Sequence, residues 1–162
     1  MTVSISVDNK LRPELCDFSS IVCFKAIVTG IEEALGEKAA LIALISAGRQ
    51  RGKQLADSLG LVDGNYSLEE ATQLMQKVLG KNGTRLCLID SIEKLENGFR
   101  VACRETICSA GEAPGSPVNL SYTLGAIQGA LETMFGVRLR GKQVESVLRG
   151  GNQDVIEFNT LG

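Results

Sequence analysis

The chain of 162 residues contains no histidine and no tryptophan. The lack of histidine removes the commonest general base, a frequent metal ligand and the usual proximal ligand of haem. Cysteine is present five times, an odd number, and no two cysteines have Cys-x-x-Cys spacing. Such usage is typical of reduced thiols rather than a disulfide framework. We therefore expect no catalytic residue and no cofactor, and a cytoplasmic location.

Long apolar runs and an excess of one charge are also missing. No run approaches the length that spans a bilayer, so we expect no transmembrane segment. The net charge is −2, from 17 basic and 19 acidic residues that are well mixed. A nucleic-acid-binding domain would favour a basic face, so we expect no such partner. Residues 1–9 include Asp8 and no basic residue, which is unlike a signal peptide.

The length and the order of patterns predict a single domain over residues 1–162. Val3, Ile5 and Val7 alternate with polar residues before Pro13 interrupts the pattern. Residues 1–17 are therefore expected to form an N-terminal arm or an edge strand.

Apolar residues spaced by three or four predict four helices, at 18–35, 37–59, 68–79 and 121–135. Ser67 and Glu70 have the spacing of a capping box at the start of the third helix. Ser121 is expected to cap the fourth helix with its hydroxyl, and Gly136 is expected to end that helix in a left-handed conformation.

Alternating patterns predict four strands. Residues 85–95 and 99–106 flank Asn97-Gly98, a strong hairpin signal. Residues 137–140 alternate, 144–148 continue or restart that strand, and 155–158 form the last one. The predicted fold class is α+β, with an antiparallel sheet of about four strands against a layer of about four helices, in the order ααα-ββ-α-ββ.

Two predicted helices each contain a pair of glycines one turn apart. The pairs are Gly48 with Gly52, and Gly125 with Gly129. Each interior glycine costs a helix roughly 1 kcal/mol relative to alanine, so a compensating contact is expected. One explanation is close helix–helix packing, which is the commoner reason. The other is that the glycines line a cavity and let a ligand lie against the backbone, and both hold if the helices cross beside the cavity.

Several segments resemble one family. They are Gly48-x-x-x-Gly52, the loop from Glu105-Thr106-Ile107-Cys108 to Ser116-Pro117, the helix Gly125-x-x-x-Gly129-Ala130-Leu131-Glu132-x-x-Phe135-Gly136, and Val144-Glu145-Ser146-Val147 with the closing strand. Together they look like the 4-vinyl reductase, or hydrocarbon-binding, domain, which is related to vesicle-tethering TRAPP subunits and to haem domains of nitric-oxide sensors. The resemblance runs from about Phe18 to the end of the chain.

The resemblance implies an α+β fold, a hydrophobic cavity between helices and sheet, and a homodimer formed through the first two helices. Many prokaryotic members carry four metal-binding cysteines. Cys108 matches the first, whereas Val118 or Asn119, Val147, and Val155 or Ile156 stand near the other three positions. One thiolate cannot complete a structural zinc site, which takes four ligands. We therefore predict no metal ion.

The function predicted from this resemblance is binding of a small hydrophobic ligand, a lipid or a tetrapyrrole precursor, as a carrier or sensor module. One alternative is a scaffold or assembly protein that acts through its dimer surfaces. Another is an accessory factor to a vinyl reductase. The expected ligand-binding residues are Phe24, Leu44, Gly48, Gly52, Cys103, Ile107, Leu124, Gly125, Ile127, Gly129 and Leu131.

Two further groups of residues leave alternatives open. The cysteines, at 16, 23, 87, 103 and 108, are either reactive thiols or small buried hydrophobic residues, and the second is commoner where no histidine base exists. The basic residues are either a site for an acidic head group or a solvated outer face, which is the usual role of charge runs. They are Arg49, Arg51, Lys53, Arg100, Arg104, Arg138 and Arg140.

Overall fold

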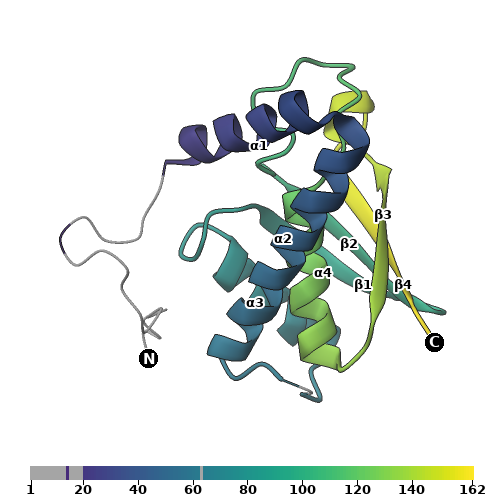
Figure 1. Cartoon of the computed structure of the whole chain (residues 1–162). Helices are drawn as coiled ribbons and strands as arrows, with labels where there is room; N and C mark the ends of the chain where they lie inside the picture. Colours follow the sequence, from purple (N-terminus) through teal and green to yellow (C-terminus); the bar gives the residue numbers. More distant parts are fainter. Residues whose placement is uncertain (1–13, 15–19, 63) are drawn as a thin grey trace.

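A computed structural model describes residues 14, 20–62 and 64–162 (Figure 1). The elements in chain order are α1 (Ile21–Leu35), α2 (Glu37–Ser58), α3 (Leu68–Leu79), β1 (Leu88–Leu95), β2 (Gly98–Arg104), α4 (Tyr122–Phe135), β3 (Leu139–Glu145), a 3-10 turn (Val147–Arg149) and β4 (Asp154–Thr160). The predicted α+β class and the order ααα-ββ-α-ββ are confirmed. The predicted arm at 1–17 lies outside the described residues, apart from Glu14.

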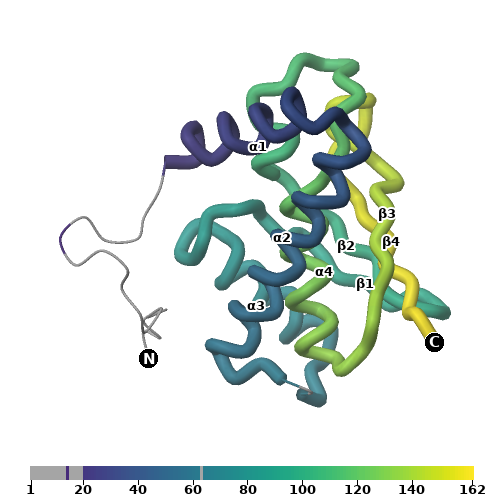
Figure 2. Tube along the Cα trace, in the orientation of Figure 1, coloured from purple at the N-terminus to yellow at the C-terminus, as the bar shows by residue number. Residues whose placement is uncertain are grey.

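The four strands form one antiparallel sheet in the order β1-β2-β4-β3. The helices lie on one face of this sheet, with α4 between α2 and the strands (Figure 2). Eleven residues of α4 are buried, in a helix of 14 residues. None of the helices in the described residues is long and apolar enough to cross a membrane.

The core lies between α4, α3 and the inner face of the sheet. Ile127, Leu131 and Met134 of α4 are buried together with Ile156 and Phe158 of β4. A smaller cluster joins α1 to α2 through Val28, Ala40 and Leu44. The position of α4 at the centre of the main cluster explains why its sequence is apolar on almost every side.

Most predicted helix ends are confirmed. The capping box is present, since the Ser67 hydroxyl accepts from the Glu70 backbone N–H and the Glu70 carboxylate accepts from that of Ser67. Gly136 adopts the left-handed conformation. The prediction that the Ser121 hydroxyl caps α4 was wrong. That hydroxyl makes no capping hydrogen bond and lies 3.6 Å from the buried sulfur of Cys108 instead.

Two strand predictions need correction. Glu96 and Asn97 form the hairpin loop, because Gly98 already pairs with Leu95 in the ladder. β3 is one strand that ends at Glu145, and residues 147–149 form a turn rather than strand. The Asp154 carboxylate accepts from the Val147 backbone N–H and the Ser146 hydroxyl accepts from that of Leu148. These local hydrogen bonds replace the ladder and turn the chain toward β4.

Candidate functional site

The four helical glycines bring α2 and α4 together backbone to backbone. A Cβ atom at Gly48 would overlap the carbonyl oxygen of Tyr122, and one at Gly52 would overlap that of Ala126. Reciprocally, a Cβ at Gly125 or Gly129 would overlap the carbonyl oxygens of Ile45 and Arg49 in α2. The packing explanation is therefore confirmed. Backbone fills the space left by the missing side chains, and a role in binding a guest stays a prediction.

The other predicted ligand-binding residues come from five parts of the chain. Cys103 of β2, Ile107 of the following loop, and Leu124, Ile127 and Leu131 of α4 are buried in the main core. Leu44 of α2 belongs to the smaller cluster.

Phe24 of α1 joins these two clusters, because it packs against both. Its ring meets the ring of Tyr122 edge to face, with centroids 4.9 Å apart. The backbone of α4 at Tyr122 in turn lies against Gly48 of α2. These contacts make the two clusters one continuous apolar interior that reaches the surface under α1.

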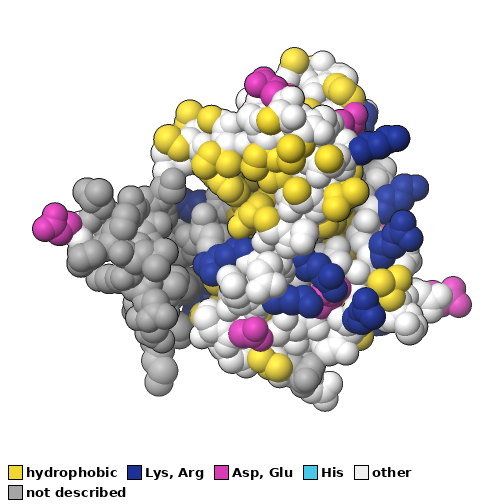
Figure 3. All heavy atoms as spheres, viewed as in Figure 1, with side chains coloured by type: hydrophobic (Ala, Val, Ile, Leu, Met, Phe, Trp, Pro, Cys, Tyr) yellow, Lys and Arg dark blue, Asp and Glu magenta, His cyan; other side chains and the backbone are white. Residues whose placement is uncertain are grey.

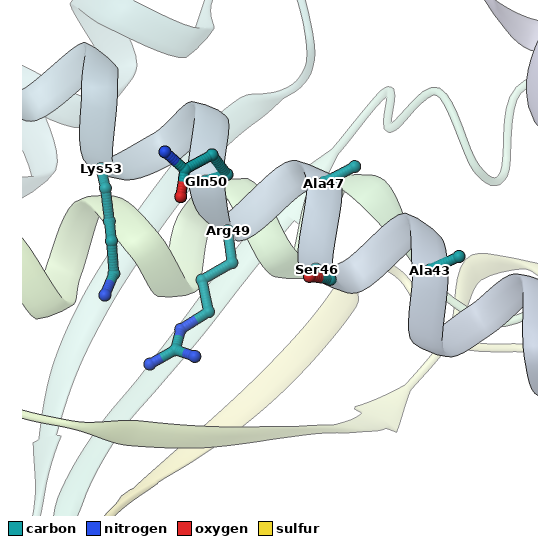
Figure 4. A pocket seen from close by; sticks show the side chains of 6 residues that line it. All are labelled: Ala43, Ser46, Ala47, Arg49, Gln50 and Lys53. Carbon is teal, nitrogen blue, oxygen red and sulfur yellow. The ribbon is translucent and has the colours of Figure 1, made fainter.

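Two hollows stand out on the surface, and neither is bordered by the apolar residues expected to bind a ligand. The larger, of about 460 Å³, lies along α2 and is lined by Ala43, Ser46, Ala47, Arg49, Gln50 and Lys53 (Figure 4). The smaller, of about 260 Å³, lies at the end of β3 and is lined by Gln143, Val144, Glu145, Ser146, Arg149 and Gly151.

Glu132 is a buried carboxylate that connects α2, α4 and β3. It accepts two hydrogen bonds from the Arg49 guanidinium, at 2.8 and 2.9 Å, and one from the Leu139 backbone N–H at 2.8 Å. Gln128 donates at 3.3 Å and the Lys53 ammonium lies 3.3 Å away.

Opposing effects act on the pKa of Glu132. Burial would raise it, but the hydrogen bonds from Arg49, Leu139 and Gln128 and the charge of Arg49 outweigh burial and hold it below its ordinary value. Sequence reasoning did not single out Glu132. The available signal was one acidic residue in an otherwise apolar helix.

The cysteines described are mostly buried. Burial raises the pKa of Cys87 to about 12 and raises that of Cys103 further, so both thiols stay protonated at neutral pH. The Cys108 sulfur accepts from the Ser121 backbone N–H at 3.4 Å. Cys23 is exposed, and Cys16 lies outside the described residues. Within residues 20–62 and 64–162, no group of three or more acidic or cysteine side chains is arranged to hold a metal ion.

The predicted basic residues have different surroundings. Arg100 pairs with Glu157 at 2.6 Å and Arg104 pairs with Asp90 at 2.7 Å, both across neighbouring strands. Arg138 and Arg140 are exposed. Arg49 and Lys53 differ from these four because they extend from the same edge of α2 beside the larger hollow (Figure 4).

An apolar surface covers α1 and the start of α2 (Figure 3). We call it the apolar face and define it by five residues with their exposed fractions: Ile21 46%, Val22 74%, Ile27 57%, Leu35 56% and Ile42 72%. Only Val28 of α1 is buried. Large exposed apolar patches commonly mark interaction sites.

Comparison with solved structures identifies the fold. The phenol-responsive sensory domain of the transcription activator PoxR, solved with phenol, matches with a TM-score of 0.68 at 11% identity, over 88% of this chain and 75% of that one. The chain shares the fold of that domain. A trafficking protein particle complex subunit 3 from Naegleria fowleri, covalently bound to palmitic acid, matches with a TM-score of 0.61 at 20% identity, over 88% and 93% of the two chains.

A vinyl-4-reductase family protein from Methanocaldococcus jannaschii matches with a TM-score of 0.56 at 16% identity, over 89% of this chain and 83% of the other. These identities establish a shared fold and nothing finer. Neither the protein-family profiles nor the curated proteins gave a match to the sequence.

Proposed function

We propose that the chain binds a small hydrophobic molecule between α2, α4 and the inner face of the sheet, as a carrier or sensor module. The supporting observation is the continuous apolar interior that Phe24 and Tyr122 join under α1. Two proteins of the same fold were solved with phenol and with palmitic acid, which are ligands of this class. Burial of apolar area supplies the affinity, at roughly 25 cal/mol per Å² before the costs of ordering.

A guest would enter beside Phe24. This side chain is half-buried, and it belongs to the described α-helix with the fewest buried residues, in which only Val28 is buried. Lys25 fixes the same turn of α1 by donating to the Cys108 carbonyl oxygen at 2.8 Å and pairing with Glu112 at 2.7 Å. Movement of this turn would open the space between the two clusters.

Titration with phenol and with palmitate tests the proposal, read by calorimetry and by native mass spectrometry of the purified protein. We expect saturable binding of at least one of them, at one molecule per chain. Ile127→Ala enlarges the interior and should preserve or strengthen binding. Phe24→Trp at the proposed entrance should slow ligand binding. Val144→Trp, at an exposed strand position, should leave ligand binding unchanged. Absence of binding in the parent chain and in Ile127→Ala would overturn the proposal.

A second role, as a homodimer that serves as a scaffold, is favoured by the apolar face. Its five defining residues are uncharged and exposed, so pairing the face with its own copy would remove their apolar area from water. A twofold contact uses the same patch on both copies, and stable interfaces bury about 800 Å² on each partner. We propose that two copies pair through α1 and α2.

Sedimentation equilibrium tests this pairing. We expect a dimer in the parent chain and a monomer in the double variant Val22→Glu and Ile42→Glu, because each charge would be buried without a partner. The control is the pair of changes Val144→Glu and Val147→Glu, at exposed apolar positions far from α1 in the chain. A parent chain that stays monomeric at high concentration would refute the dimer.

A further inference from the structure

We propose that the larger hollow on α2 is an anion-binding site, which takes a carboxylate or phosphate group. It lies on the outer side of α2, opposite the glycine face that meets α4. It is therefore separate from the interior in which a hydrophobic guest is proposed. A volume of about 460 Å³ is within the range of small-molecule sites, roughly 300–1,000 Å³.

The first argument is charge. Arg49 and Lys53 both border the hollow, and Glu132 is the acid that the described structure pairs with them. Two positive charges and one negative charge leave a net charge of +1 at this edge of α2. The side chain of Glu132 is 3% exposed, whereas those of Arg49 and Lys53 are 34% and 40% exposed. The excess charge therefore faces the hollow and the solvent.

The second argument is the supply of donors. Arg49 uses its Nε–H and one Nη2–H on Glu132, so the N–H groups on Nη1 remain for another acceptor. Ser46 and Gln50 also line the hollow, and neither has a hydrogen-bond partner among the described residues. The hydroxyl and the amide add neutral donors beside the two cations.

The third argument is preorganisation. The two-point bond to Glu132 fixes the plane of the Arg49 guanidinium, because a carboxylate and a guanidinium meet in one geometry. Glu132 is itself held by Gln128 and by the Leu139 backbone. A ligand would therefore meet a cation that is already in place, which lowers the ordering cost of binding.

The site is tested first with inorganic phosphate. Backbone amide shifts of the labelled protein are followed by NMR as sodium phosphate replaces sodium chloride at constant ionic strength. We expect saturable shifts at Ser46, Gln50 and Lys53. Lys53→Gln should weaken binding about tenfold, as for the loss of one charged hydrogen bond. Lys142→Gln, the same change on an exposed strand position, is the matched control and should leave the affinity unchanged.

A second variant guards against a folding defect. Gln50→Glu places an acid in the hollow at an exposed position that makes no bond to Glu132, so the variant should fold and lose phosphate binding. Shifts that chloride reproduces, or an affinity that Lys53→Gln and Gln50→Glu leave unchanged, would overturn the proposal.

The source of the anion is resolved by a second set of titrations. Dodecanoate and dodecanol share a chain and differ in charge. If the ligand is the head group of an amphiphile, Lys53→Gln weakens dodecanoate binding and spares dodecanol. If the ligand is a free anion, dodecanoate binds no more tightly than phosphate, and Lys53→Gln weakens the binding of both to the same extent. Repeating the phosphate titration with Val22→Glu alone separates this site from the dimer, since that change lies in α1 and leaves α2 and every lining residue of the hollow in place.

Discussion

α1 and α4 are apolar helices of similar length, 15 and 14 residues, in opposite environments. Eleven residues of α4 are buried, whereas α1 buries one. The difference lies in the neighbours, because α4 has α2 on one side and the sheet on the other, while α1 packs on α2 and Tyr122 along a single side. Apolar side chains thus form the core in α4 and remain largely exposed in α1.

Matched glycine substitutions should give the largest contrast. In Gly125→Ala the new Cβ overlaps the Ile45 carbonyl oxygen, and backbone cannot repack as a side chain does. We expect a loss of about 4 kcal/mol, above the usual range for overpacking. In Gly30→Ala the Cβ meets nothing within 4 Å, so α1 should gain about 1 kcal/mol from helix propensity. Urea denaturation measures both, and equal stabilities would mean that α2 and α4 do not meet backbone to backbone.

Truncation of an isoleucine comes next. Ile127 is fully buried and Ile27 is 57% exposed. Ile127→Ala should cost about 3 kcal/mol through lost burial and the cavity that remains. Ile27→Ala should change stability by less than about 0.5 kcal/mol when the chain is monomeric. A cost for Ile27→Ala that grows with protein concentration would instead report the proposed dimer.

Removal of a carboxylate should have a smaller, pH-dependent effect. Glu132→Gln loses hydrogen bonds from a charged acceptor and should cost about 2 kcal/mol at pH 7. The pKa of Glu132 is lower in the folded state than in the unfolded chain. The contribution of Glu132 to the free energy of unfolding is therefore complete above its pKa in the unfolded chain, about 4.3. It is lost as the pH falls through the pKa in the folded state.

Urea midpoints at pH 7, 5 and 3 check this prediction. The parent chain should lose more stability than Glu132→Gln between pH 5 and pH 3. Glu33→Gln, the same change at an exposed position of α1, should follow the parent at every pH. If stability fell with pH in Glu132→Gln to the same extent as in the parent chain, the ion pair between Arg49 and Glu132 would contribute nothing to acid sensitivity.

Thiol labelling should distinguish exposed α1 from the buried core without altering stability. In a Cys16→Ser background, Cys23 on α1 is exposed, while Cys87, Cys103 and Cys108 are buried. At pH 8 we expect maleimide to label one thiol per native chain and four after denaturation, because the buried thiols are shielded and Cys87 has a pKa of about 12. Rapid labelling of a second thiol would reveal opening of the core.

Local signals in the sequence predicted most of the fold. Ser67 and Glu70 act over three residues, and α3 begins and ends where their spacing and Gly80 indicate. Of the two explanations for the glycine pairs, close helix–helix packing is confirmed, and α2 and α4 are the partners. Such features depend on a few neighbouring residues, which is why one sequence suffices for them.

Long-range contacts account for what the sequence did not predict. Glu132 bonds Arg49, which is 83 positions away, and no local pattern indicates that pairing. The Ser121 hydroxyl lies 3.6 Å from the sulfur of Cys108, which is 13 positions earlier in the loop between β2 and α4, and no helix-capping pattern indicates that contact. The hollow beside Arg49 and Lys53 lies along α2 alone, but the way both cations are held depends on their long-range pairing with Glu132.

One residue, Gly36, both ends α1 and begins α2. Its φ of 77° and ψ of 157° belong to a backbone region that is essentially restricted to glycine. α1 has 15 residues and is therefore about 22 Å long. The two backbone torsion angles of Gly36 consequently determine the direction of α1 relative to α2. A rotation of a few degrees at Gly36 would displace the N-terminal end of α1 by more than an ångström.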